Sequence, residues 1–336
     1  MEKKFLSLSL LSLLFIFSGV TYSEEQIPTD VFGSPPLIGT VKISPSGEKI
    51  AMYATLQNGD SAILVRDLNE NKPLRPIATS DNRTLKLLSF NWFNDDIILA
   101  SAWLAADFYG TKLDNTRLLR INVDGTGFEP LFKKRHFKDL PWQPPQQTGI
   151  IDWLEDDDDH ILVSVRVSNM RSPDVVKVNV KKNTIKIIKK GVAGTSGWMT
   201  DEYGEVRIGY TYDRNRSAGS IIFKDHGSTK WRTIWKYTTL SKDSVSVLGF
   251  GEDPNKVWFE AYEDDKIAVF SADISKQNFE PELVYSHPER DVETRLRYKE
   301  GSKDPIGISF RDENYHMITW DKLSLIHISE PTRPRL

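Results

Sequence analysis

The segment Ile43-Ser-Pro-Ser-Gly-Glu-Lys-Ile50 is a polar turn between two apolar runs, and variants of it return five more times along the chain. These variants begin at Trp92, Trp153, Trp198, Phe250 and Tyr298. The six turns are centred on Gly47, Asp95, Asp157, Gly204, Asn255 and Ser302, so successive centres lie 48, 62, 47, 51 and 47 residues apart. A repeat of this length that contains several short strands is typical of a β-propeller.

Each repeat is divided into four short strands by turn residues. In the first repeat we expect strands at 41–44, 50–56, 62–68 and 74–78, because Pro, Gly, Asn and Asp residues that favour turns lie between them. The same division continues through five repeats, whereas the sixth provides three strands. No stretch has the period of a convincing amphipathic helix. We therefore predict an all-β fold: a β-propeller of four-stranded blades over residues 30–322. Five blades are complete, the sixth is partial, and the propeller is incomplete at its C-terminal end.

The longest interval between turns requires an insertion, and residues 133–147 are the obvious candidate. Pro141, Pro144 and Pro145 favour a loop there rather than a strand. Such a segment is either a functional loop or a structural crossover between blades. An aromatic residue precedes five of the six turns, and packing between adjacent blades explains this period better than a binding ring does.

Residues 1–23 have the features of a secretory signal peptide. Glu2-Lys3-Lys4 is a short charged start, residues 5–20 are mainly apolar, and Thr21-Tyr22-Ser23 offers small residues to a signal peptidase. The apolar stretch is short and rich in serine for a membrane span, which makes an anchor helix the weaker alternative. We expect an exported protein, periplasmic or extracellular, that does not contact the membrane after cleavage.

The composition argues against several kinds of site. The 336 residues include no cysteine and carry a net charge of −3, which excludes disulfides and thiol catalysis and disfavours a nucleic-acid partner. The six histidines are isolated, so none stands at metal-ligand spacing from another. The acidic run Glu155–Asp159 lacks the glycine and distal glutamate of a calcium loop and falls on the repeated turn, where a solvated hairpin tip is expected. Gly194-Thr-Ser-Gly197 has the wrong spacing for a nucleophile elbow. We assign no catalytic, cofactor-binding or metal-binding residue and expect no cofactor.

The last residues, 323–336, depart from the repeat. They fit neither its turns nor its strand pattern, and Leu323 to Arg333 resembles the translation of an adaptor used in sequencing libraries. We expect this tail to be artefactual and the open reading frame to have been cut within a blade.

Several segments resemble bacterial prolyl oligopeptidase-family serine peptidases, including acylaminoacyl-peptidase-like members. The resemblance spans about residues 30 to 320 and rests chiefly on Phe32–Ala51, Ser89–Asp95, Leu119–Gly125 and Asp201–Arg207. The last of these resembles the Asp-x-x-Gly-x-x-Arg strand pair of that family. In the family an N-terminal propeller covers an α/β-hydrolase domain that carries Ser, Asp and His. The resemblance implies that this chain is a truncated N-terminal propeller and that the hydrolase half is absent from it.

The leading hypothesis is therefore a substrate-gating propeller domain of an exported serine peptidase that hydrolyses short peptides. The peptide partner would meet the missing hydrolase domain, so the chain itself should be inactive. The alternative is a stand-alone periplasmic propeller that binds or assembles proteins without catalysis. Peptide specificity, total blade number and oligomeric state stay open.

Overall fold

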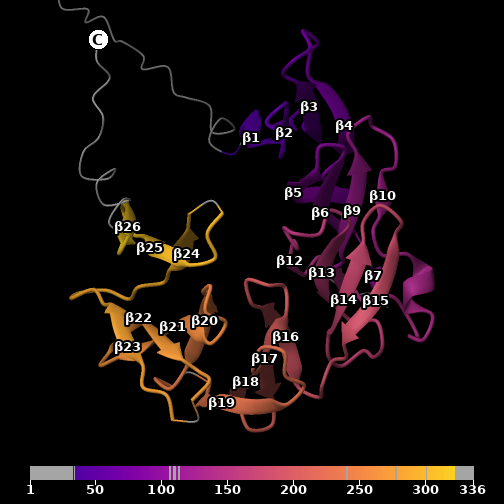
Figure 1. Ribbon diagram of the computed structural model, residues 1–336. Coiled ribbons are helices and arrows are strands. Elements are labelled where there is room, and N and C mark those ends of the chain that lie inside the picture. The colour runs from indigo at the N-terminus through magenta and orange to yellow at the C-terminus, as the bar shows by residue number, and fades with distance from the viewer. Residues whose placement is uncertain are drawn as a thin grey trace, which may run out of the picture.

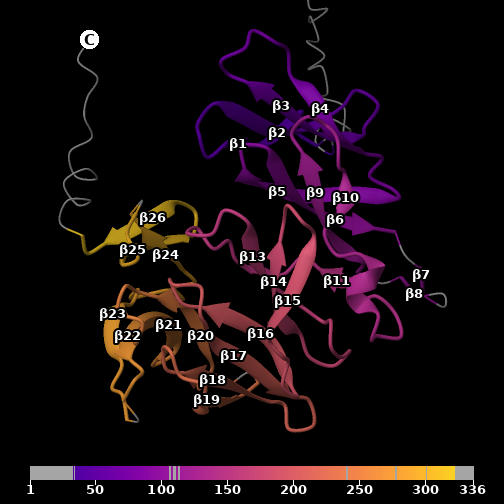
Figure 2. The same ribbon diagram turned by 45° about the vertical axis from the view of Figure 1, so that its right-hand side comes forward.

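The computed structural model describes residues 33, 35–105, 107–108, 111–112, 114–239, 241–276, 278–299 and 301–321. Six antiparallel sheets follow one another around an open ring, with strands β1 to β4 at one end and β24 to β26 at the other (Figures 1 and 2). Within this part of the chain, the sheets confirm the predicted propeller: four blades have four strands, blade 2 has five because its outer edge is divided into two short strands, and the sixth has three.

The strands of each blade pair in chain order, from the inner strand outward. Blade 1 contains β1 (Ile38–Ile43), β2 (Lys49–Thr55), β3 (Ser61–Asp67) and β4 (Arg75–Ser80); blade 2 contains β5 (Leu85–Asn94), β6 (Ile97–Leu104), β9 (Thr116–Asn122), β10 (Glu129–Pro130) and β11 (Gln146–Gln147). Blade 3 contains β12 (Ile150–Asp152), β13 (His160–Val165), β14 (Asp174–Asn179) and β15 (Thr184–Lys189); blade 4 contains β16 (Thr195–Thr200), β17 (Val206–Asp213), β18 (Ala218–Lys224) and β19 (Trp231–Thr238). Blade 5 contains β20 (Val245–Phe250), β21 (Lys256–Glu263), β22 (Lys266–Asp273) and β23 (Glu282–Tyr285); blade 6 contains β24 (Arg295–Tyr298), β25 (Pro305–Arg311) and β26 (Tyr315–Thr319).

Blade 2 departs from the predicted pattern at its outer edge. Its outer strand β10 covers only Glu129–Pro130, and a second short strand, β11, pairs in parallel with the start of β9. The excursion between them contains a 3-10 helix, η1 (Lys134–Phe137), with Phe137 buried. The expected loop at 133–147 is thus an insertion within the outer strand of the blade, and it ends in a strand. A two-stranded hairpin, β7 (Asp107–Phe108) with β8 (Thr111–Lys112), was not predicted.

The recurring turn joins the first and second strands of each blade, and its geometry explains its residues. In blade 1 the amide of Ser44 donates to the carbonyl oxygen of Lys49 at 2.8 Å, and Gly47 has a φ of +79°. In blade 4 the amide of Asp201 donates to the carbonyl of Glu205 at 2.9 Å, and Gly204 has a φ of +73°. A left-handed conformation at this position explains why the turn so often contains glycine.

The aromatic residues before the turn reach back to the preceding blade. Trp92 Nε1 donates to the carbonyl of Lys42 at 3.1 Å, Trp198 Nε1 to that of Pro173 at 2.8 Å, and Tyr298 Oη to that of Phe250 at 2.9 Å. Each bond crosses from one blade to the one before it. These contacts confirm the packing interpretation for Trp92, Trp198 and Tyr298.

Apolar side chains fill every seam between consecutive blades. Ala51 and Phe90 belong to a cluster shared by blades 1 and 2, and Val269 and Ile308 belong to one shared by blades 5 and 6. The blades therefore hold together chiefly by burial of apolar surface between sheets. No helix among the described residues is long and apolar enough to cross a membrane. The signal peptide at 1–23 and the tail at 323–336 lie outside the described residues and stay predictions.

Candidate functional site

The recurring turns of several blades contact one another at one end of the ring. Ser46 Oγ donates to Asp95 Oδ1 at 2.7 Å, which joins the turns of blades 1 and 2. Lys303 of blade 6 donates to the carbonyl of Glu202 in blade 4 at 2.8 Å, although the two are far apart in sequence. The recurring turns therefore bring polar and charged groups of different blades into contact.

Burial shifts the pKa of two titratable groups at this convergence, Glu202 and Tyr298. Burial raises the pKa of Glu202 above its ordinary value, and the nearby carboxylate of Asp152 adds to the increase, whereas Tyr298 and Lys303 oppose it. Burial, with the charge of Glu202 as a second cause, raises the pKa of Tyr298. The Lys303 ammonium lies 4.4 Å from the ring centroid of Tyr203. Lys303 therefore interacts with the carboxylate of Glu202 and with the ring of Tyr203. We interpret these contacts as structural contacts between blades 4, 5 and 6.

The segment Asp201–Arg207 builds a second, buried network. Asp201 Oδ1 accepts from the amides of Tyr203 and Glu205, each at 3.0 Å, and thereby fixes the turn. Its Oδ2 accepts from Arg207 Nη1 at 2.8 Å, and both side chains are completely buried. Arg207 Nη2 also donates to the carbonyl of Pro254 in blade 5 at 2.8 Å. The spacing Asp-x-x-Gly-x-x-Arg therefore makes a turn and joins it to the next blade.

Asp201, Glu205 and His226 could be read as a metal site, because their ligand atoms lie within 4.8 Å of one another. Each of these three side chains already interacts with a charged or titratable neighbour in the structure. Arg207 pairs with Asp201, Lys224 pairs with Glu205, and His226 Nδ1 lies 3.1 Å from Asp201 Oδ2 and 3.0 Å from Glu205 Oε2. Two fixed cations beside two carboxylates oppose the binding of a metal ion. We interpret this cluster as a structural ion-pair network.

The acidic run at 155–159 lies between β12 and β13, and three of its carboxylates contact lysines. Asp157 Oδ2 lies 2.7 Å from Lys177 Nζ, and Asp159 Oδ1 lies 2.8 Å from Lys181 Nζ. Asp156, which is 95% exposed, lies 3.6 Å from Lys303 of blade 6. These contacts tie the turn to its own blade and to blade 6.

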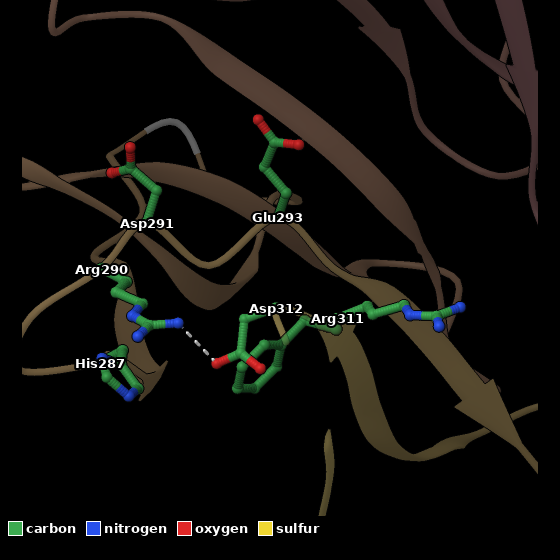
Figure 3. A pocket seen from close by; sticks show the side chains of 7 residues that line it. His287, Arg290, Asp291, Glu293, Arg311 and Asp312 are labelled. Carbon is green, nitrogen blue, oxygen red and sulfur yellow. Dashed lines mark hydrogen bonds and ion pairs between the residues drawn. The ribbon is translucent and has the colours of Figure 1, made fainter. Parts of the chain in front are cut away.

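A small cavity of about 140 Å³ lies where blades 5 and 6 meet (Figure 3). Phe310 lines it together with three basic residues, His287, Arg290 and Arg311, and three acidic residues, Asp291, Glu293 and Asp312. Arg290 Nη1 donates to Asp312 Oδ2 at 3.0 Å, so two of the charges cancel. In Figure 3 the guanidinium of Arg311 extends away from His287 and Arg290. The cavity is small and is lined by groups of both charges, which makes it a poor site for an ionic ligand.

The histidines of the described chain bind carboxylates, amides and backbone groups. His160 Nδ1 lies 2.8 Å from Asp157 Oδ1, and His316 Nε2 lies 2.8 Å from Asp312 Oδ1. Nδ1 of His136 and Nδ1 of His287 accept from backbone amides. None of the hydrogen bonds among these residues joins a histidine to a serine hydroxyl, which is the contact that activates a serine nucleophile. The sequence assigned no catalytic residue, and that assignment stays a prediction.

No family model matches the chain, and no curated protein matches it. Among solved structures, it is similar to an acylaminoacyl peptidase in complex with Z-Gly-Gly-Phe-chloromethyl ketone: 15% identity, TM-score 0.42, covering 88% of this chain and 46% of that one. The acylaminoacyl peptidase of Pyrococcus horikoshii gives 17% identity, TM-score 0.43, and coverage of 88% and 47%. The β-propeller domain of the trilobed protease from Pyrococcus furiosus gives 16% identity, TM-score 0.42, and coverage of 84% and 81%.

The chain spans about half the length of the two acylaminoacyl peptidases. At these TM-scores the similarities carry no argument about function. The sheet order and the contacts between blades are what establish the architecture, and they make this chain an open β-propeller of six sheets in the described residues.

Proposed function

We propose that this chain is the propeller domain of an exported serine peptidase that hydrolyses short peptides, with its α/β-hydrolase domain encoded downstream. The observation that carries the proposal is the segment Asp201–Arg207, which resembles a strand pair of the prolyl oligopeptidase family. In this fold the segment provides a buried turn and an ion pair that reaches the next blade. The segment is also the recurring turn of blade 4, and its buried ion pair and its bond to blade 5 give the resemblance a structural role.

In the proposed arrangement the propeller gates access to the catalytic cleft. A ring of rigid sheets admits an extended chain or a small peptide but excludes a folded protein, so the substrate class follows from size. The chemistry would belong to the downstream domain, where a triad activates serine and backbone amides stabilise the oxyanion. No residue of the present chain is assigned a part in that reaction.

The decisive experiment is to read the uninterrupted gene beyond the codon for Trp320. We expect an open reading frame that completes the propeller and then encodes Gly-x-Ser-x-Gly, followed by Asp and His. A stop codon soon after the blade is complete would refute the peptidase and leave the stand-alone binding propeller.

Export is tested separately on the natural protein. Cell fractionation followed by N-terminal sequencing should place the protein outside the cytoplasm, with Glu24 as its first residue. Recovery of the intact N-terminus from the cytoplasm would contradict the export part of the proposal and leave the peptidase part unaffected.

A further inference from the structure

The excursion that interrupts the outer strand of blade 2 carries a dense run of basic residues. Residues 133–138 read Lys-Lys-Arg-His-Phe-Lys, and they form η1 together with one residue on either side of it. No other sheet in the described part of the chain has its outer strand divided in this way. The run is therefore an addition to blade 2 and not a consequence of the repeat.

Two contacts hold η1 on the outer side of the ring (Figure 1). Phe137 is 3% exposed and belongs to the apolar cluster shared by blades 2 and 3. Arg135 Nη2 donates to the carbonyl oxygen of Asn183 at 2.7 Å and to its Oδ1 at 3.1 Å, which joins η1 to the turn between β14 and β15. The same turn carries Lys181 and Lys182, so basic residues of blades 2 and 3 lie side by side.

Carboxylates neutralise only part of this positive charge. Glu129 forms ion pairs with Arg120 and Lys133, at 3.2 and 2.6 Å. Asp159 forms one with Lys181 at 2.8 Å. Among the residues that the structure describes, no carboxylate forms an ion pair with the four cations that remain, which we call the basic edge: Lys134, Arg135, Lys138 and Lys182.

The basic edge is exposed, and the charge around it is mainly positive. All four of its residues are exposed. The pKa of the His136 imidazole lies below its ordinary value, because burial and then the charges of Arg135 and Lys133 disfavour the cation. Asp139 is the one acidic residue in the sequence 133–147. The whole chain carries a net charge of −3, so this excess of positive charge is local.

The form of the basic edge indicates what kind of anion it can bind. Lys134 and Lys138 are four residues apart along η1, roughly 8 Å at the rise of a 3-10 helix, so one small anion cannot bridge the set. The exposed residues of 133–139 include no apolar side chain, whereas protein interfaces and membrane surfaces bind through apolar groups as well as charge. A linear polyanion binds mainly by releasing its counterions and needs no apolar contact.

We propose that the basic edge binds an acidic linear polysaccharide, with carboxylates of successive sugars on its cations. Asn183 occupies Nη2 of Arg135, and the other N–H groups of this guanidinium remain for a carboxylate. The choice of a polysaccharide over a nucleic acid follows from export and so rests on the proposed function. The binding itself needs neither export nor a catalytic domain.

The test measures fluorescence anisotropy of labelled probes mixed with the 336-residue chain. The acidic probe is a linear octamer of glucuronate, and the neutral control is the matching octamer of glucose. Free glucuronate, added as a competitor, tests for a single small-anion site, and octaglutamate tests for an acidic peptide. We expect the glucuronate octamer to bind, and to bind more weakly as salt is added. The glucose octamer should not bind, and octaglutamate should bind less tightly because a flexible chain loses more conformational entropy.

The variant Lys134→Gln with Lys138→Gln should bind the glucuronate octamer about tenfold more weakly, which corresponds to the loss of two exposed ion pairs. The matched control is Lys230→Gln with Lys236→Gln in blade 4. Both of these lysines are exposed, neither forms an ion pair within the described chain, and the charge removed is the same. The control should bind like the unaltered chain, and both variants should keep its unfolding temperature because the changed side chains are exposed.

Equal losses in the two variants would overturn the proposal. Binding of free glucuronate or of octaglutamate as tight as that of the glucuronate octamer would also overturn it. The export experiment decides the rest, since an intact N-terminus in the cytoplasm would overturn the polysaccharide as the partner. An exported protein that fails to bind the glucuronate octamer would contradict the basic edge alone and leave the proposed peptidase unaffected.

Discussion

The change Asp201→Asn is the sharpest test of how the blades are joined. It keeps the size of the side chain and its first oxygen, which accepts from the amides of Tyr203 and Glu205. It removes the negative charge that faces Arg207 and places an amide N–H against a guanidinium N–H if the oxygen stays on the turn. The turn is thus preserved while the ion pair is lost.

The expected cost follows from burial. Both partners of the pair are completely buried, and the atoms Arg207 Nη1 and Asp201 Oδ2 are 2.8 Å apart. Burial lowers the pKa of Arg207, and the interaction with Asp201 raises it, so the pair is what supports the charged form. Removing one member of a buried pair leaves the other charge uncompensated, which typically costs about 3–5 kcal/mol. Because Arg207 keeps its hydrogen bonds to the carbonyls of Lys224 and Pro254, we expect a loss in the free energy of unfolding near the middle of that range.

The assay is urea unfolding followed by tryptophan fluorescence, since the chain has nine tryptophans. The matched control is Asp265→Asn, which removes the exposed partner of Lys242 and should leave the unfolding curve unchanged. A loss for Asp201→Asn as small as that of the control would refute the reasoning, because a buried cation without its partner cannot be neutral for stability. The double variant Asp201→Asn with Arg207→Met should recover part of the loss, because the oxygen that fixes the turn is kept and no buried cation is left without its partner.

Three further predictions concern single features. Trp198→Phe should lower the free energy of unfolding by about 1–2 kcal/mol, because the hydrogen bond to the carbonyl of Pro173 is lost from a residue that is 4% exposed. Tyr315→Phe, on a side chain that is 59% exposed, is the comparison, and an equal effect would argue against the bond between blades. Burial raises the pKa of Glu260, so its ionised form is disfavoured in the folded state. The stability of the natural chain relative to Glu260→Gln should therefore increase as the pH falls through that raised pKa toward about 4. Thermal unfolding of both proteins at several pH values measures this difference, and a difference that does not change with pH would contradict the prediction. The chain should show no turnover of aminoacyl or peptide esters. A hydrolytic activity whose specific activity stays constant through successive purification steps would contradict the hypothesis that the chain is inactive.

Local signals predicted most of the strands. Apolar runs and the turn residues between them predicted strands at 50–56 and 62–68, each within one residue of β2 and β3 in the structure. The pairing of β11 with β9 was missed because two residues carry no period, and a parallel partner far along the chain leaves no local trace. The same limit applies to β7 and β8, which are two residues each.

Only part of the candidate functional site could be predicted from the sequence. The spacing of Asp201, Gly204 and Arg207 was visible through a resemblance, but the carbonyl of Pro254 that receives Arg207 belongs to another blade and could not be inferred.

The bonds from Trp92, Trp198 and Tyr298 to the preceding blade have a direction, and the direction matches that of protein synthesis. Each acceptor carbonyl leaves the ribosome before its donor does, so a blade that has just been made finds its anchor already in place. Assembly can therefore proceed during translation without waiting for the ring to close. A chain stopped at any blade boundary would keep the bonds made so far, whereas one that lost its first blade would leave Trp92 without an acceptor.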